Sequence, residues 1–162
     1  MKPVRFISPP GTYFVTFSTY HRRKLFVVEL YARLFLETLY RHRREGRYEL
    51  HAFVVMPEHV HLLLTPASDV TIERAIQLIK GAYSHELRTI IGRDQEIWQR
   101  GFTDHRIRSE LDFMHHRNYI HHNPVERGMV GDPGEYRYCS AFQGFKLAPW
   151  PSAAEAARLR AS

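Results

Sequence analysis

Two histidines separated by one residue, His59 and His61, are the part of this sequence best suited to metal chemistry. They open a run of β-strand character, and side chains on a strand alternate between its faces, so both imidazoles face the same way with Cα atoms about 6.5 Å apart. Two imidazoles at that spacing can share one metal ion. Val60, Leu62 and Leu64 form the opposite face and indicate a well-buried strand. A pair of hydrogen-bonded sheet histidines is the alternative interpretation.

A tyrosine and an asparagine near the end of an expected helix form the second reactive set. Tyr119 and Asn123 are four residues apart, which places them on one helical face, about 6 Å apart along the axis. A phenol acts as a nucleophile when it is activated or when its target phosphate is polarised, and a metal held by the two histidines would polarise such a phosphate. A packing role for Tyr119 is the alternative, because the chain has 9 tyrosines.

Further histidines lie on the same expected helix. His115, one turn before Tyr119, is placed to orient or deprotonate the phenol. The whole group is equally well explained as a solvated cluster: His115, His116, His121 and His122.

Charge indicates a polyanionic partner. The chain has 23 Lys+Arg against 17 Asp+Glu, a net charge of +6, and a basic domain attracts polyanions, nucleic acid first among them. Arginine dominates, with 19 Arg against 4 Lys, and it makes bidentate contacts with phosphates and guanine edges. Codon bias in a GC-rich genome is the alternative, but the charges are clustered. The candidate DNA contacts are Arg22, Arg23, Lys24, Arg100, Arg106 and Arg108.

The elements that position these groups follow from hydrophobic spacing. We expect strands at residues 12–20, 48–56, 59–65 and 102–108, and helices at 27–45, 71–92 and 109–122. Asp69 or Thr71 is expected to cap the second helix, Gly92 to end it and Ser109 to open the third. The strand at 48–56 is apolar on both faces toward its end and is expected to be central, and Pro124 is expected to stop the last helix. This order predicts an α+β fold: a ferredoxin-like antiparallel sheet with helices packed on one face.

Length and composition predict one domain. The 162 residues are 44% hydrophobic and 25% charged, which excludes disorder, and we assign 1–145 to the domain and 146–162 to a short Ala-rich tail. The single cysteine, Cys139, excludes an intrachain disulfide and a Cys-based zinc cluster. No apolar run approaches the roughly 20 residues of a membrane helix. Prolines stand near the start of the chain, where a signal peptide would have its apolar stretch, so we expect no signal peptide. We therefore expect a cytoplasmic protein with no membrane partner.

Three motifs in this order resemble those of the single-tyrosine HUH transposases of insertion sequences, most closely the REP-associated tyrosine transposases. The motifs are FVVMPEHVHLL at 53–63, WQRGFTDHRIR at 98–108 and YIHHNPVERGMV at 119–130, with YCSA at 138–141 trailing them. The likeness covers roughly residues 10 to 143. Three motifs in register are far more specific than any one of them.

The resemblance implies an HUH domain that cuts single-stranded DNA. Tyr119 would attack a phosphodiester and leave a 5′-phosphotyrosine link and a free 3′-OH. His59 and His61 would be the metal pair, Asn123 the third ligand, and Mg²⁺ or Mn²⁺ the cofactor. For the REP-associated group, the resemblance implies recognition of hairpin DNA beside a short single-stranded tetranucleotide. We expect a monomer, with a homodimer as the alternative.

Two other functions stay open beside this enzyme. One is a non-catalytic module of the same fold that binds DNA hairpins, and the other is a metal-dependent hydrolase of another nucleic acid in which Tyr119 is only structural. The presence of His59, His61, Tyr119 and Asn123 together favours the transposase chemistry, because a pure binding module needs none of the four.

Overall fold

A four-stranded antiparallel sheet forms the centre of the molecule, as the computed structural model shows for residues 7–151 and 153–161. Its strands are β1 (Tyr13–Ser18), β2 (Tyr48–Val55), β3 (His59–Pro66) and β4 (Thr103–Arg106). Their order across the sheet is β2-β3-β1-β4, so the two middle strands are β3 and β1. This order, with a helix after β1 and another after β3, is the ferredoxin-like sheet expected from the sequence.

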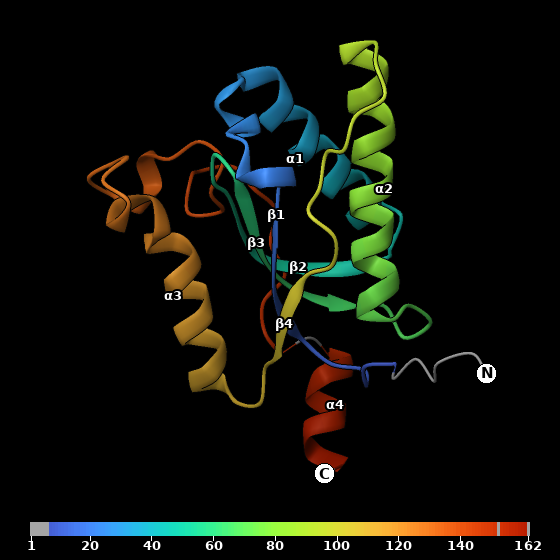
Figure 1. Cartoon of the computed structure of the whole chain (residues 1–162). Helices are drawn as coiled ribbons and strands as arrows, with labels where there is room; N and C mark the ends of the chain where they lie inside the picture. The colour runs from blue at the N-terminus through green and yellow to red at the C-terminus, as the bar shows by residue number, and fades with distance from the viewer. Residues whose placement is uncertain (1–6, 152, 162) are drawn as a thin grey trace, which may run out of the picture.

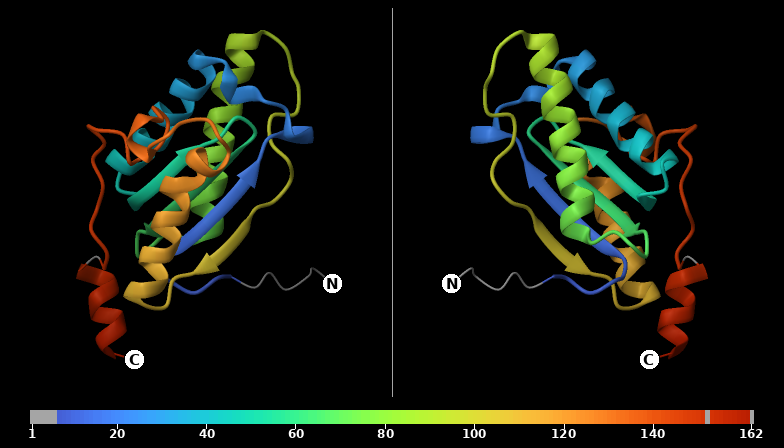
Figure 2. Two further views of the ribbon diagram at one scale, coloured as in Figure 1. Left: turned by 90° about the vertical axis from the view of Figure 1, so that its left-hand side faces the viewer. Right: turned by 90° about the vertical axis from the view of Figure 1, so that its right-hand side faces the viewer.

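The helices cover both faces of the sheet. They are α1 (Glu29–Arg44), α2 (Ile72–Ile91), α3 (Glu110–Glu126) and α4 (Ala153–Ala161). α1 and α2 pack on one face, while α3 crosses the opposite face (Figures 1 and 2). The expectation of helices on one face therefore holds for α1 and α2 only. A third helix has to cover the second face because β3 is buried along its whole length.

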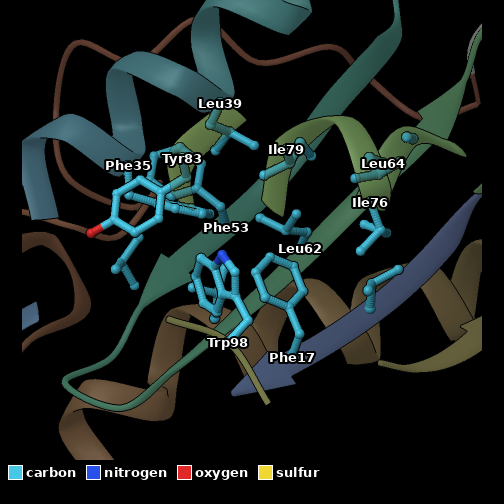
Figure 3. Packing of buried hydrophobic residues seen from close by; sticks show 14 of the residues in the cluster. Phe17, Phe35, Leu39, Phe53, Leu62, Leu64, Ile76, Ile79, Tyr83 and Trp98 are labelled. Atoms are coloured by element: carbon cyan, nitrogen blue, oxygen red, sulfur yellow. The ribbon is translucent and has the colours of Figure 1, made fainter. Parts of the chain in front are cut away.

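The larger core lies between the sheet and the pair α1 and α2. Aromatic rings from β1, α1, β2, α2 and the segment before β4 meet there with aliphatic residues of β3 and α2 (Figure 3). Trp98 belongs to this core: it is only 8% exposed, and its indole N–H donates to the carbonyl of Lys80 at 3.2 Å. It is therefore a core residue and does not offer a free face for stacking bases.

A smaller core lies between the sheet and α3. Leu63 of β3 and Val54 of β2 pack there with Phe113 and Ile120 of α3. Since side chains alternate along a strand, Leu63 shares its face of β3 with His59 and His61. The smaller core therefore fixes α3 against the face that carries the two histidines.

β2 is an edge strand, which corrects the expectation that it is central. Its outer edge is covered by the chain after α3: the amide of Val55 donates to Tyr138, and the amide of Ser140 donates to Phe53, at 2.8 and 2.9 Å. The amide of Ala148 adds a third such bond, to Leu50, at 2.8 Å. Because this segment pairs the outer backbone edge of β2 and the helices cover both faces of the sheet, β2 is apolar on both faces although it is an edge strand.

Capping residues mark the helix starts that the sequence predicts. The hydroxyl of Thr71 accepts the amide of Arg74 before α2, and that of Ser109 accepts the amide of Asp112 before α3, both at 3.1 Å. α2 ends at Gly92, which has φ of 78° and so occupies the left-handed region that favours glycine.

The expected end of α3 at residue 122 is wrong. The helix continues through Pro124, which is buried, to Glu126. A proline inside a helix forfeits one hydrogen bond and is disfavoured by roughly 3 kcal/mol. Here tertiary contacts outweigh that preference, because the extra turn buries Pro124 and brings Arg127 to the carboxylate of Glu58, between β2 and β3. No helix in the described part of the chain is long and apolar enough to cross a membrane.

Candidate active site

Two buried imidazoles face each other at the start of β3. The Nε2 atoms of His59 and His61 are 3.0 Å apart, and both side chains point to the face covered by α3. Their backbone positions pair with Ser18 and Thr16 of the neighbouring strand β1. The two histidines therefore lie on the same face of the strand, as the alternation of side chains predicts.

The outer nitrogens of both rings are held by neighbouring side chains. His59 donates from Nδ1 to Oε1 of Glu58 at 2.9 Å, because a carboxylate only accepts. Nδ1 of His61 lies 2.7 Å from the hydroxyl of Thr16. A partner on Nδ1 sets the orientation of a metal-binding histidine and leaves Nε2 to face the ion.

Burial keeps the two histidines neutral. It lowers the pKa of His61 to about 3, and the nearby His59 adds to the effect. Burial also lowers the pKa of His59, although the hydrogen bond to Glu58 opposes it. Burial raises the pKa of Glu58, but hydrogen bonds from Arg127 and His59 outweigh it and hold that pKa at about 2. At neutral pH the site therefore offers two neutral imidazoles beside an ionised carboxylate.

The path of α3 over β3 brings the remaining candidates to this pair. The ring of Tyr119 meets that of His61 edge-on, with centroids 5.3 Å apart. Eight residues later, Nη1 of Arg127 lies 2.7 Å from Oε1 of Glu58. Eight helical residues span about 12 Å, which is close to the roughly 10 Å of extended chain between His61 and Glu58. Asn123 lies midway along the helix between Tyr119 and Arg127, whose partners are His61 and Glu58.

The amide oxygen of Asn123 is the unsatisfied group of this site. Its Oδ1 is buried and has no hydrogen-bond partner among the described residues, which is rare for a buried polar atom. Two neutral imidazole nitrogens and an unpaired amide oxygen form a donor set that suits a divalent cation. The residues present therefore fit the metal that the sequence resemblance implies.

Tyr119 is open to an incoming substrate. Its side chain is held on one side by His61 and by Phe14 of β1, whose ring centroid is 5.9 Å away. On the other side it is 49% exposed. Tyr119 therefore keeps about half of its surface accessible to solvent.

Three residues of the site were missed in the sequence: Thr16, Glu58 and Arg127. Glu58 directly precedes the histidine pair, and Arg127 continues the four-residue spacing of Tyr119 and Asn123, so both carry a local signal. Thr16 has none, because its contact with His61 depends on how β1 pairs with β3.

The predicted DNA-binding residues lie in two groups near opposite ends of β1. Arg22, Arg23, Lys24 and Arg100 are near its C-terminal end, where the backbone of Gln99 bonds to Ser18. Arg106 and Arg108 are near the other end, where Arg106 pairs with Tyr13. Arg22 is partly engaged: it lies 3.3 Å from Glu58, although its side chain is 60% exposed. Its left-handed φ of 50° is strained for a residue other than glycine.

The four histidines of α3 do not form one solvated cluster. His121 is half-buried against the hydroxyl of Ser140 at 2.9 Å, and burial lowers its pKa to about 4. His116 contacts Asp112, His122 contacts the backbone of its own helix, and His115 is exposed.

The ferredoxin-like sheet is the fold expected for the single-tyrosine HUH class that the motifs indicate. The family model described as "Transposase IS200 like" matches residues 11–123, which include His59, His61, Tyr119 and Asn123. The chain therefore belongs to the IS200-like transposase family.

Within this family, the chain is similar to the REP-associated tyrosine transposases. The REP-associated tyrosine transposase of Escherichia coli (strain K12) is 30% identical over 135 residues, 83% of this chain and 78% of that protein. A relative from Haemophilus influenzae is 28% identical over 151 residues, 87% of this chain and 85% of that one. The solved structure of a REP-associated tyrosine transposase bound to a REP hairpin aligns with a TM-score of 0.71 and 25% identity, covering 93% of this chain and 95% of that one.

Proposed function

We propose that this transposase nicks single-stranded DNA beside a hairpin and transfers the strand through a 5′-phosphotyrosine on Tyr119. One observation carries the proposal: the half-exposed Tyr119 ring packs against His61 of a buried, neutral histidine pair. A histidine pair that served only the sheet would not need a nucleophile beside it.

The metal would be held by His59, His61 and the amide oxygen of Asn123. When bound, Mg²⁺ or Mn²⁺ neutralises charge on the phosphate that is transferred. Imidazole ligands favour Mn²⁺ over Mg²⁺, since the latter prefers oxygen ligands. Glu58 and Thr16 would orient the two rings through their Nδ1 atoms.

In the proposed reaction, Tyr119 is the nucleophile. Its phenolic oxygen attacks the phosphorus, the P–O3′ bond breaks, and the released O3′ takes up a proton, while the phenolic proton leaves to solvent on the exposed side of the ring. Attack by another 3′-OH on the phosphotyrosine reverses these events and joins the new strand. The number of phosphoester bonds is unchanged in each step, so no external energy source is needed.

The basic groups at both ends of β1 would bind the DNA backbone around Tyr119. A structural relative is described as bound to a REP hairpin, which supports a hairpin as the recognised form of DNA. We further propose that the chain works as a monomer. Tyr119 packs against His61 of its own chain, and Asn123 is on the same helix, so the proposed site needs no residue from a second copy.

The test is covalent capture of labelled DNA. Hairpin oligonucleotides with single-stranded flanks, labelled at the 5′ or the 3′ end, are incubated with the protein and Mn²⁺ and separated on a denaturing gel. The 3′ label should shift with the protein and the 5′ label should appear on a shorter strand with a free 3′-OH. Tyr119→Phe and a chelator should abolish both signals, whereas Tyr138→Phe, a change to a half-buried tyrosine away from the histidines, should retain them.

The same gel separates the two rival functions. Salt-sensitive binding without an adduct for any REP-like hairpin tried would favour the non-catalytic binding module. Cleavage that persists in Tyr119→Phe would favour the metal-dependent hydrolase.

A further inference from the structure

A second group of metal-ligand side chains lies outside the site described above, where β4 leads into α3. It consists of His105 on β4, Asp112 in the first turn of α3 and His116 one turn later. Nε2 of His105 is 2.9 Å from Oδ2 of Asp112, and Nδ1 of His116 is 3.1 Å from Oδ1. One donor atom from each residue therefore falls within 4.8 Å of the other two.

The distances between these donor atoms are close to the distances between the ligands of a bound metal ion. Ligands at 2.0–2.1 Å from a tetrahedral Zn²⁺ lie about 3.3 Å from one another. The two nitrogen-to-carboxylate distances are already slightly shorter than this. Any larger gap is between the two imidazoles, whose rings are stacked with centroids 4.6 Å apart. The side chain of His105 is 45% exposed and is free to adjust.

The carboxylate of this group is available to a cation. Burial raises the pKa of Asp112, but hydrogen bonds from His105 and the amide of Arg108 outweigh it, so the pKa is lowered and the group is ionised at neutral pH. Within residues 7–151 and 153–161, its ion-pair partners are the two imidazoles, and no arginine or lysine side chain is among them.

Binding would leave no helix carbonyl unpaired. Nδ1 of His116 also contacts the backbone oxygen of Asp112 at 2.8 Å, and metal binding would replace that contact. The same oxygen remains paired with the amide four residues on, as in any α-helix. The cap of α3 accounts for Asp112 through its amide bond to Ser109, but it does not account for two histidines converging on the carboxylate.

We propose that His105, Asp112 and His116 bind a divalent transition-metal ion, with Zn²⁺ as the best fit, separate from the histidine pair of β3. Two imidazoles and a carboxylate suit Zn²⁺ and disfavour Mg²⁺, which prefers oxygen ligands. The bound ion clamps the edge strand β4 to the first half of α3.

The clamp lies next to the nucleophile. The ring of Phe14 contacts His116 at 4.8 Å, His61 at 5.4 Å and Tyr119 at 5.9 Å, measured between centroids. An ion that fixes His116 therefore also fixes the aromatic residue against which Tyr119 rests. Its role is structural, since its three ligands do not include Tyr119 or the β3 pair.

The test is Zn²⁺ binding in a background that lacks the β3 pair. In the full chain carrying His59→Gln and His61→Gln, calorimetry at pH 7.5 should still detect one equivalent of Zn²⁺ with micromolar or tighter affinity. Adding His105→Gln should weaken binding at least 30-fold. Adding His115→Gln, a change to an exposed histidine of the same helix, should leave it unchanged.

Thermal unfolding gives a second readout, independent of DNA cleavage. Saturating Zn²⁺ should raise the melting temperature of the double variant and of its His115→Gln derivative, but not of the His105→Gln derivative. Zn²⁺ binding that is absent from the double variant, or equal in the His105→Gln and His115→Gln derivatives, would overturn the proposal. Neither result bears on the phosphotyrosine mechanism, which the gel assay tests separately.

Discussion

A single buried carboxylate, Glu58, organises the residues around the proposed metal site. It accepts a hydrogen bond from His59 and pairs with Arg127 at the end of α3 and Arg22 after β1. Exposed ion pairs contribute little to stability, but the side chain of Glu58 is only 6% exposed. Loss of one of its three partners would leave this buried charge less well compensated, which is costly. One side chain thus connects three segments that are distant in sequence.

Glu58→Gln should weaken Mn²⁺ binding about 10- to 100-fold, because His59 would lose the charged acceptor that orients it. DNA cleavage at limiting Mn²⁺ should fall in parallel and recover at high Mn²⁺. Calorimetric titration of Mn²⁺ measures the first effect and the gel assay the second. Glu49→Gln, which changes an exposed glutamate on the neighbouring strand, is the matched control. Equal Mn²⁺ affinity in the two variants would exclude an orienting role for Glu58.

At the scale of elements, α3 is the helix that assembles the site. Tyr119, Asn123 and Arg127 are spaced by four residues along it and so share one face. The same face meets His61 at one end and Glu58 at the other. The last turn of α3, beyond the expected stop at Pro124, is therefore what allows Arg127 to reach Glu58.

The chain after residue 145 is packed against the domain. Ala148 bonds to the free edge of β2, and Trp150 stacks on Phe113 of α3 with centroids 5.2 Å apart. The indole N–H of Trp150 donates to the hydroxyl of Thr12 at 2.9 Å. The boundary at residue 145 stays a prediction, and these contacts predict that residues 146–150 contribute to stability.

A chain that ends at residue 145 should be less stable than one that ends at residue 151 by roughly 2 kcal/mol, since loss of a core tryptophan costs about 3–5 kcal/mol and Trp150 is half-buried. Urea unfolding of both chains, followed by circular dichroism, measures the difference. The chain that ends at residue 151 is the control because it keeps Ala148 and Trp150. Similar midpoints for the two would place the domain boundary at residue 145 after all.

At the scale of the whole molecule, buried histidines make stability depend on pH. Burial lowers the pKa of His51, His59, His61 and His121 below the ordinary value of 6.5. Below pH 6.5 the unfolded chain therefore binds protons that the folded chain does not. This contribution to stability is fully present above pH 6.5 and is lost as the pH falls.

The free energy of unfolding of the metal-free protein should therefore fall steadily between pH 6.5 and 4.5. Below pH 4.5 the depressed pKa of Glu58 adds to the loss, because that carboxylate is protonated first in the unfolded chain. Urea titrations in chelator across this range measure the slope. His51→Gln removes one of these histidines, so it should reduce the slope of the unfolding free energy against pH by up to about 1.4 kcal/mol per pH unit, the value for one proton. A flat profile from pH 6.5 to 4.5 would contradict the burial of neutral histidines.

Local periodicity was sufficient for much of this protein. Alternation along β3 determined that His59 and His61 share a face, and helical spacing determined that Tyr119 and Asn123 share another. Thr71, Gly92 and Ser109 marked the helix ends they were expected to mark. The order of elements and the three motifs determined the ferredoxin-like sheet and the family.

Only the tertiary structure decided which of these elements meet. Glu58 with Arg127, and His105 with His116, are brought together by the packing of α3 across the second face of the sheet. The cover on the edge of β2 comes from residues 83 to 98 positions later in the chain. Sequence periods report which side chains share a face within one element. Contacts between elements depend on packing and burial summed over the whole fold, and for that reason they also overrode the local signal of Pro124.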